Sequence, residues 1–143
     1  MRRLLMVCAM CLGIQVGHAQ DAPGTAAGLG QAAEHARQAW FAHDAGGLVA
    51  DSPRLVVQLP GADPSAALEP AQAAALIRDY IASAEEVETV VNAAREVEGG
   101  RGYVEIQRRY RVSGTQNVRS QSLLLGYRLG RSGWLLVELR VVG

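Results

Sequence analysis

The sequence has no lysine, few aromatic residues and, beyond its first 19 residues, no cysteine. All 14 basic residues are arginine, and both cysteines, Cys8 and Cys11, lie in an apolar run near the N-terminus. If that run is removed as a signal, the remaining chain has neither a disulfide nor a thiol. This excludes a cysteine nucleophile and a thiolate metal site. The absence of lysine also excludes a Walker-type phosphate loop.

The N-terminus has the three parts of a secretory signal. Arg2 and Arg3 form a short positive segment, residues 4–14 are apolar, and Gly17 and Ala19 are the small residues that a signal peptidase requires before Gln20. The apolar run has 11 residues, fewer than the roughly 20 that span a bilayer. The sequence therefore predicts a signal peptide over 1–19 and a periplasmic or secreted protein with no membrane attachment after cleavage.

Charge is distributed unevenly along the chain. Residues 20–98 contain 4 arginines and 12 acidic residues, whereas residues 99–143 contain 8 arginines and 2 glutamates. A basic segment can bind nucleic acid, but these arginines are spread along alternating strand patterns of a protein predicted to be exported. We therefore expect no nucleic-acid partner, and we expect the acidic first part to pack against the basic second part.

Apolar spacing predicts helices first and strands afterwards. Residues 20–28 are predicted to be a flexible leader. An apolar stripe at helical spacing runs from Leu29 to Trp40, and both Trp40 and Phe41 are expected in the core. The expected elements are a helix from residue 29 to about 40, a short turn at 48–50, a strand at 54–59, a helix at 70–83, and strands at 86–98, 103–113, 118–129 and 134–142. Short links that contain glycine join the last four strands, as in antiparallel hairpins. The lengths of these links predict that Leu125 pairs with Leu139, Tyr127 with Val137 and Tyr110 with Gln121. The fold class is therefore α+β, with a curved antiparallel sheet of four long strands and one short strand wrapped around N-terminal helices.

Three stretches, residues 39–48, 55–61 and 133–141, resemble the nuclear transport factor 2-like superfamily, which includes SnoaL-like polyketide cyclases and ketosteroid isomerases. The last stretch is similar to small exported domains of unknown function, in which an aromatic residue precedes Glu-Leu-Arg. The resemblance covers residues 29–143 and implies one domain with a cystatin-like cone. It also implies a homodimer through the outer face of the sheet.

Strand alternation places several polar side chains on the inner face of the expected sheet. A buried arginine must be paired or lie at a wet opening, so Arg108 indicates either a ligand or an internal acid. The first alternative is a small anionic or apolar ligand in the cone. The second is an ion pair between Arg108 and a helical acid such as Asp79 or Glu34. The candidate ligand-binding residues are Arg95, Arg108, Tyr110, Gln121 and Tyr127.

Three residues are candidates for catalytic chemistry. His43 could act as a general base, with Tyr80 or Tyr110 as further acid–base groups, but no carboxylate is expected within reach of His43. A histidine that stabilises the end of a helix is the favoured interpretation. The spacing of histidines and acids matches no metal site, and Glu85, Glu86 and Glu88 are expected only to cover the start of a strand. The sequence contains no nucleotide-binding motif, so no metal or cofactor is expected.

Three functions remain open at this stage. The sequence favours a non-catalytic binding module that holds a small ligand in the cone or a partner on the sheet. The alternatives are a lyase- or isomerase-type enzyme that acts on a small apolar substrate, and a purely structural homodimer. Outward charged residues such as Arg109, Arg111 and Arg140, together with Trp134 and Leu136, make the outer face of the sheet the expected dimer surface.

Overall fold

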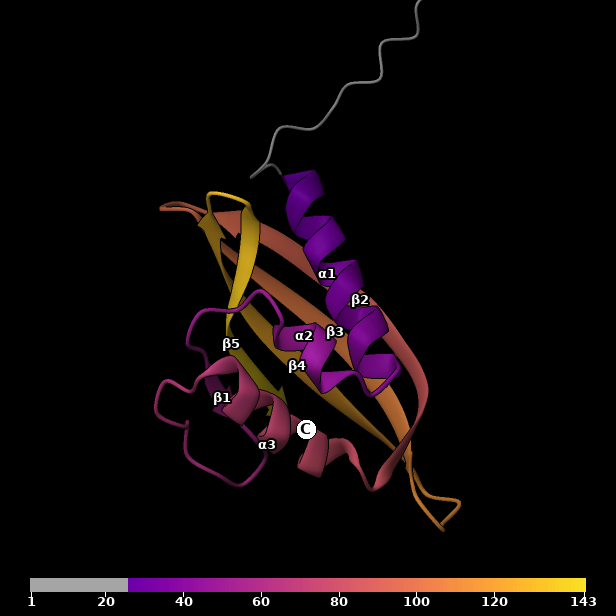
Figure 1. The fold of residues 1–143 in the computed structure, drawn as a ribbon. Coiled ribbons are helices and arrows are strands. Elements are labelled where there is room, and N and C mark those ends of the chain that lie inside the picture. Colours follow the sequence, from indigo (N-terminus) through magenta and orange to yellow (C-terminus); the bar gives the residue numbers. More distant parts are fainter. Residues whose placement is uncertain (1–25) are drawn as a thin grey trace, which may run out of the picture.

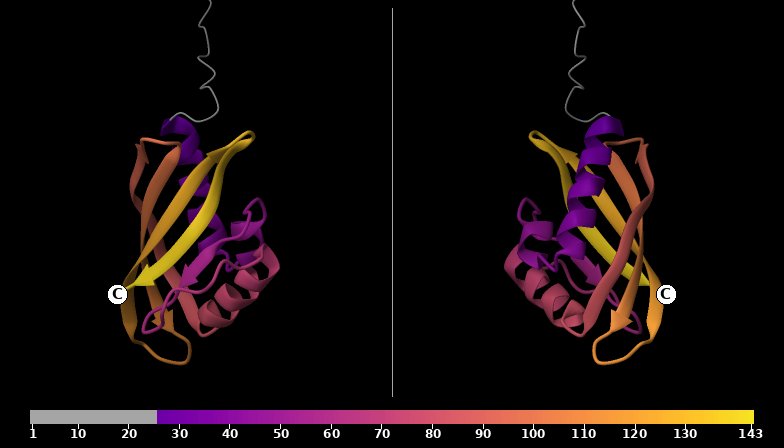
Figure 2. Two further views of the ribbon diagram at one scale, coloured as in Figure 1. Left: turned by 90° about the vertical axis from the view of Figure 1, so that its left-hand side faces the viewer. Right: turned by 90° about the vertical axis from the view of Figure 1, so that its right-hand side faces the viewer.

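Three helices cover one face of a curved five-stranded sheet, and the other face of the sheet is left open (Figures 1 and 2). The computed structural model describes residues 26–143. The predicted signal peptide and the leader up to residue 25 lie outside these described residues. The elements are α1 (Ala26–Phe41), α2 (Ala45–Val49), β1 (Val56–Gln58), α3 (Pro70–Ile81), β2 (Ala84–Val97), β3 (Arg101–Val112), β4 (Val118–Gly130) and β5 (Gly133–Val142).

The sheet has the strand order β1-β5-β4-β3-β2. The four long strands form an antiparallel meander, and the short β1 pairs with β5 in parallel. This confirms the predicted fold class, a sheet of four long strands and one short strand against N-terminal helices. The predicted boundaries are correct to within a few residues, although α1 begins at Ala26, ahead of the expected Leu29.

The corner between α1 and α2 has a clear local cause. His43 adopts a left-handed conformation with φ of 56°, and its amide donates a hydrogen bond to the Trp40 carbonyl at 2.9 Å. Asp44 then caps α2, since its carboxylate accepts a hydrogen bond from the Gly47 amide at 2.8 Å. The chain therefore turns sharply, and α2 packs beside α3.

The core lies between the helices and the inner face of the sheet. It contains the apolar stripes of α1 and α3 together with inward side chains of β3, β4 and β5; its fully buried members include Leu29, Trp40, Ile77, Ile81, Ile106, Leu123 and Leu139. Phe41, which the helical pattern also favoured as a core residue, is 47% exposed. Phe41 ends α1 and points away from the stripe that Trp40 occupies.

The strand registers differ from prediction at both ends of β4. The expected pairing of Leu125 with Leu139 is present, but a bulge beside Gly126 then brings Leu136, and not Val137, opposite Tyr127. Leu136 and Trp134 therefore turn inward, and their predicted place on the outer face is wrong: Leu136 is buried, and Trp134 packs against the core. At the other end Gln121 pairs with Arg108, whereas the sequence predicted Tyr110 there. That second difference is a slip of two residues, which leaves every side chain on its predicted face.

Within residues 26–143, no helix combines the length and the apolar character that crossing a membrane requires.

Candidate functional site

A buried ion pair lies at the centre of the polar site on the inner face of the sheet. The side chains of Arg108 and Glu86 are only 1% and 2% exposed. Arg108 Nε donates to Glu86 Oε2 at 3.2 Å, and Arg108 Nη2 donates to Glu86 Oε1. This two-pronged geometry is the strongest arrangement that a guanidinium can make with a carboxylate. The predicted partners are therefore wrong, since Arg108 pairs neither with Asp79 nor with Glu34.

Glu34 has its own partner on the surface of α1. Its carboxylate accepts hydrogen bonds from Arg37, the shorter at 2.6 Å. These bonds, with a smaller contribution from Gln38, lower the pKa of Glu34 to about 2. Asp79 is exposed on α3. Neither helical acid enters the core.

Gln121 and Tyr80 extend the polar site toward α3. The Gln121 side-chain oxygen accepts hydrogen bonds from Arg108 Nη1 at 3.2 Å and from the Tyr80 hydroxyl at 3.0 Å. Burial raises the pKa of Tyr80, and the bond to Gln121 only partly opposes this effect. The Tyr80 phenol therefore stays protonated and acts as a donor.

Two aromatic rings hold the Arg108 guanidinium on its remaining sides. Its central carbon lies 4.1 Å from the ring centre of Tyr110 and 5.1 Å from that of Trp40. Both distances fall within the range of cation–π contact. Arg108 is therefore held by a carboxylate, an amide and two rings. Contacts within the core thus determine the position of its guanidinium.

His43 reaches the same site from the corner after α1. Its Nε2 atom lies 3.4 Å from Glu86 Oε1, and its side chain is 31% exposed. The sequence predicted no carboxylate within reach of His43, and this was wrong, because Glu86 was assigned to the start of a surface strand. His43, Tyr80 and Tyr110 are only partly buried, so they form a polar rim above the closed Arg108–Glu86 pair.

Two β-bulges explain why Glu86 was missed. Strand β2 has register shifts between Glu86 and Glu88 and again between Val91 and Ala93. Each bulge adds a residue and reverses the alternation of faces. The first bulge turns Glu86 inward opposite Tyr110. No glycine or proline lies in this part of the sequence, so simple alternation gave no sign of either bulge.

The second bulge moves Arg95 to the other face of the sheet. Arg95 was expected inside, close to Arg108, but it is exposed and pairs with the outward residue Tyr103. Tyr127 is inward and buried as predicted, yet it pairs with Gly102 near the other end of the sheet. The structure therefore brings together Arg108, Tyr110, Gln121, Tyr80 and His43, and leaves Arg95 and Tyr127 outside this group.

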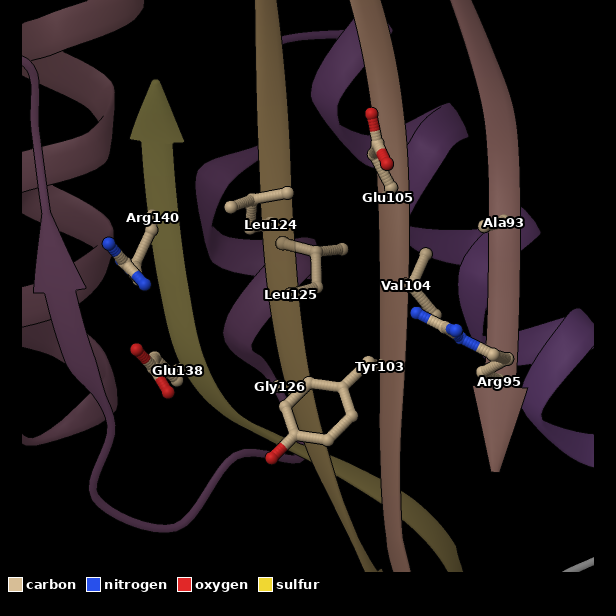
Figure 3. Close-up of a pocket in the computed structure, with 10 residues that line it drawn as sticks. All are labelled: Ala93, Arg95, Tyr103, Val104, Glu105, Leu124, Leu125, Gly126, Glu138 and Arg140. Atoms are coloured by element: carbon tan, nitrogen blue, oxygen red, sulfur yellow. The ribbon is translucent and has the colours of Figure 1, made fainter. Parts of the chain in front are cut away.

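A shallow hollow lies on the outer face of the sheet (Figure 3). We name it the outer hollow; its volume is about 250 Å³, and its lining includes Arg95, Tyr103, Glu105, Gly126, Glu138 and Arg140. Tyr103 is 46% exposed, and its ring lies over the strand position of Gly126, where no side chain projects (Figure 3). Among residues 26–143, Arg95, Glu105 and Glu138 form no ion pair.

The described residues contain no group of three or more histidine, cysteine, aspartate or glutamate side chains that could hold a metal ion. The side chains of the inner site, His43, Glu86 and the tyrosines, can form hydrogen bonds and can transfer protons at the rim.

Comparison with known proteins gives a fold but no close relative. No family model and no curated protein matches the sequence. Among solved structures, a ketosteroid isomerase-like protein from Erwinia carotovora atroseptica SCRI1043 matches with a TM-score of 0.66 and 13% identity, covering 80% of this chain and 92% of that one. A protein described as Rd1NTF2_04 with long sheet has a TM-score of 0.62 at 16% identity, covering 79% and 98%. The chain has the nuclear transport factor 2-like fold.

A third match is a domain whose function is not known. A domain of unknown function with a cystatin-like fold, from Nostoc punctiforme PCC 73102, has a TM-score of 0.62 and 16% identity, covering 78% of this chain and 72% of that one. The resemblance seen in the sequence is thus confirmed as a likeness of fold. At such low identity, the likeness carries no activity or ligand to this protein.

Proposed function

We propose that this protein is an exported, non-catalytic binding module that holds a partner on the outer face of its sheet, and that the partner is a second copy of the chain. The observation that carries this proposal is one row of residues across four strands. Arg95, Tyr103, Gly126 and Glu138 are successive cross-strand neighbours on β2, β3, β4 and β5. The row has a positive charge at one end, a negative charge at the other and an aromatic ring near its middle.

Such a row is complementary to itself. A two-fold axis that lies in the interface, parallel to the strands and between β3 and β4, places each Arg95 opposite Glu138 of the other copy. Each Tyr103 then lies opposite Gly126 of the other copy, and the two Tyr103 rings are neighbours across the axis, where aromatic contact contributes roughly 0.5–1.5 kcal/mol beyond the burial of area. A symmetric dimer needs a single patch that matches itself in this way.

The adjacent row is compatible with the same arrangement. Ala93, Glu105, Leu124 and Arg140 are cross-strand neighbours in that order. The same axis places Glu105 opposite Leu124 and Arg140 opposite Ala93, so no like charges face each other. Charges at such an interface act mainly on orientation and on the choice of partner, and apolar contact supplies most of the affinity.

Charge reversal tests this dimer directly. We expect the purified protein to sediment as a dimer at micromolar concentration. Arg95→Glu should weaken the dimer at least about tenfold in Kd, equivalent to about 1.4 kcal/mol, because both symmetric contacts become repulsive. The double variant Arg95→Glu/Glu138→Arg should recover dimerisation, since it exchanges the two ends of the row. Arg131→Glu, in the hairpin between β4 and β5, is the matched control and should change nothing.

Two outcomes would contradict the proposal. One is a wild-type protein that stays monomeric at 100-fold the concentration used for the variants. That concentration is on the order of hundreds of micromolar, a range in which specific interfaces are occupied. The other is a double variant that dimerises as weakly as Arg95→Glu alone. That result would show that Arg95 does not pair with Glu138 of the other copy.

A small ligand inside the cone is less favoured by the geometry. Glu86 already neutralises Arg108, and Trp40 and Tyr110 cover the guanidinium. An anionic ligand would have to displace a buried carboxylate, which costs several kcal/mol. Native mass spectrometry of the protein purified from its own envelope would distinguish the two cases, because it reports bound ligand and oligomeric state together.

A specific contact favours a second candidate, a lyase- or isomerase-type enzyme. His43 lies 3.4 Å from the Glu86 carboxylate at a partly exposed rim, with Tyr80 and Tyr110 alongside. A histidine oriented by a carboxylate can remove a proton next to a carbonyl group. If this activity exists, the protein should incorporate deuterium from D2O into a small cyclic ketone, and His43→Gln should abolish the incorporation. Equal exchange in the variant and the wild type would rule out His43 as the base.

A further inference from the structure

The outer face of the sheet carries one cross-strand pair in which two positive charges are opposite each other. Arg101 on β3 pairs with Arg128 on β4, and both side chains are exposed. Like charges directly opposite each other on neighbouring strands destabilise a sheet. Among the cross-strand pairs of the described residues, this is the only one that joins two charges of the same sign.

The other outward arginines of β3 have acidic residues opposite them. Arg109 pairs with Glu88 and Arg111 with Glu85, and the shortest distances between the charged groups are 3.5 Å and 3.6 Å. Arg101 lies on the same face of the same strand, but it has an apolar residue of β2 on one side and an arginine of β4 on the other. The sheet therefore neutralises two of these arginines and leaves the third without an acidic neighbour.

The acids at the same end of the sheet do not compensate for this. Glu96 pairs with the buried Gly102, which faces the core, so Glu96 lies on the inner face. Glu98 follows β2 in the hairpin and is exposed. Within residues 26–143, neither Arg101 nor Arg128 forms an ion pair. A counter-charge for the two arginines must therefore come from outside the described residues.

The proposed dimer doubles this positive charge, and the inference that follows rests on that dimer. We define the arginine row as the successive cross-strand neighbours Val97, Arg101, Arg128 and Leu135. The two-fold axis between β3 and β4 places each Arg101 opposite Arg128 of the other copy. The two ends of the row are apolar, so the row of the other copy supplies no acid. Sheets that pack face to face are about 10 Å apart, so four guanidinium groups share a narrow space at the axis.

We propose that a phosphate or sulfate group binds between these four arginines and joins the two copies at this end of the interface. Each copy contributes Arg101 and Arg128, so the site is complete only in the dimer. The planar guanidinium group matches the oxygens of such an anion and can bind two of them at once. A chloride ion offers neither paired oxygens nor a second charge. The occupant is therefore a divalent oxyanion, either a free ion or the phosphate group of a larger ester.

Sedimentation of the purified protein in matched salts tests this site. The probes are inorganic phosphate and glucose 6-phosphate, each compared with sodium chloride of the same ionic strength near neutral pH. Phosphate at about 10 mM should lower the Kd of the dimer about tenfold, the effect of a ligand that binds only the dimer with its own Kd on the order of 1 mM. An effect of inorganic phosphate alone identifies a free ion as the occupant. An equal effect of glucose 6-phosphate identifies a site that also accepts esters, and both results support the proposal.

A matched pair of variants separates the site from a general effect of the anion. Arg128→Gln removes the repulsion at both symmetric contacts, so in chloride it should dimerise about threefold more tightly than the wild type, the scale expected for two exposed charge contacts. Its dimer should not respond to phosphate. Arg119→Gln is the control, because Arg119 is also exposed on β4 but pairs with the inward Tyr110. This variant should keep the phosphate response of the wild type.

The outcomes distinguish this site from the dimer itself. If the wild type dimerises equally well in chloride and in phosphate, the dimer stands and the anion site is wrong. The same conclusion follows if Arg128→Gln keeps the phosphate response, because phosphate also strengthens apolar burial without binding at a site. A protein that stays monomeric in both salts contradicts the proposed dimer, and the anion site with it.

Discussion

Replacing Arg108 with alanine is expected to lower the free energy of unfolding by about 3–5 kcal/mol, the typical effect of removing one partner from a buried ion pair. Glu86 would then remain in the core as an uncompensated charge, at 2% exposure. Gln121 would lose the Arg108 donor, and the Trp40 and Tyr110 rings would lose their contact with the guanidinium. Urea unfolding followed by tryptophan fluorescence measures the change.

The neighbouring arginine is the matched control. Arg109 points to the outer face and lies 3.5 Å from Glu88, with both side chains about half exposed. Exposed pairs of this kind contribute roughly 0–1 kcal/mol, so Arg109→Ala should be nearly neutral. Equal losses of stability in the two variants would show that the assignment of faces on β3 is wrong.

A double variant isolates the pairing itself. Arg108→Met/Glu86→Leu removes both charges and keeps most of the side-chain volume. Replacing a buried pair with apolar residues is often neutral or stabilising, so the double variant should be more stable than Arg108→Ala. If it were less stable, the effect of Arg108→Ala would come from lost packing around the ring contacts and not from an unpaired carboxylate.

Trp40→Ala is the second substitution with a large expected effect. Trp40 is 1% exposed within the core cluster and lies against the Arg108 guanidinium. Truncation of a buried tryptophan removes its apolar area and leaves a cavity, which together cost about 3–5 kcal/mol. Thermal unfolding followed by circular dichroism should show a Tm lower by roughly 10 °C or more for a domain of this size.

Phe41 provides an aromatic control one position further along α1. Its side chain is 47% exposed, and surface substitutions usually change stability by no more than about 0.5 kcal/mol. Phe41→Ala should therefore unfold close to the wild-type temperature. A large loss in this variant, comparable to that of Trp40→Ala, would mean that Phe41 is covered in solution by something other than residues 26–143.

The sequence predicted the strands well because their signals are local. Glycine-bearing links at 114–117 and 130–133 mark hairpins, and alternation along β3 places Arg108 inside and Arg109 outside, as the structure confirms. The helical stripe likewise identified Leu29 and Trp40 as buried. Each of these inferences depends on spacing within one element.

The partner of Arg108 could not be predicted in the same way. Its identity depends on whether β2 keeps a regular alternation, and that is decided by pairing with β3 across the hairpin. The bulge after Glu86 depends on contacts between strands, because it allows the buried arginine to pair with a carboxylate from the adjacent strand. An energetic argument could have predicted the inward position of Glu86. A buried arginine needs a partner, and the adjacent strand is rich in acids, so one of those acids is expected to turn inward.

The bulges of β2 also affect how molecules of this protein can meet. Strand β2 is the long edge strand of the sheet, and the short β1 forms the other edge. A long, regular edge is a template on which another chain can add a strand, with fibre growth as the risk. The β2 edge is a poor template for this, because two bulges interrupt its 14 residues. It also carries the glutamates at 85, 88 and 96. The first bulge, which brings Glu86 to Arg108, thus also hinders the addition of further strands at this edge. The outer face of the sheet is then the better surface for self-association.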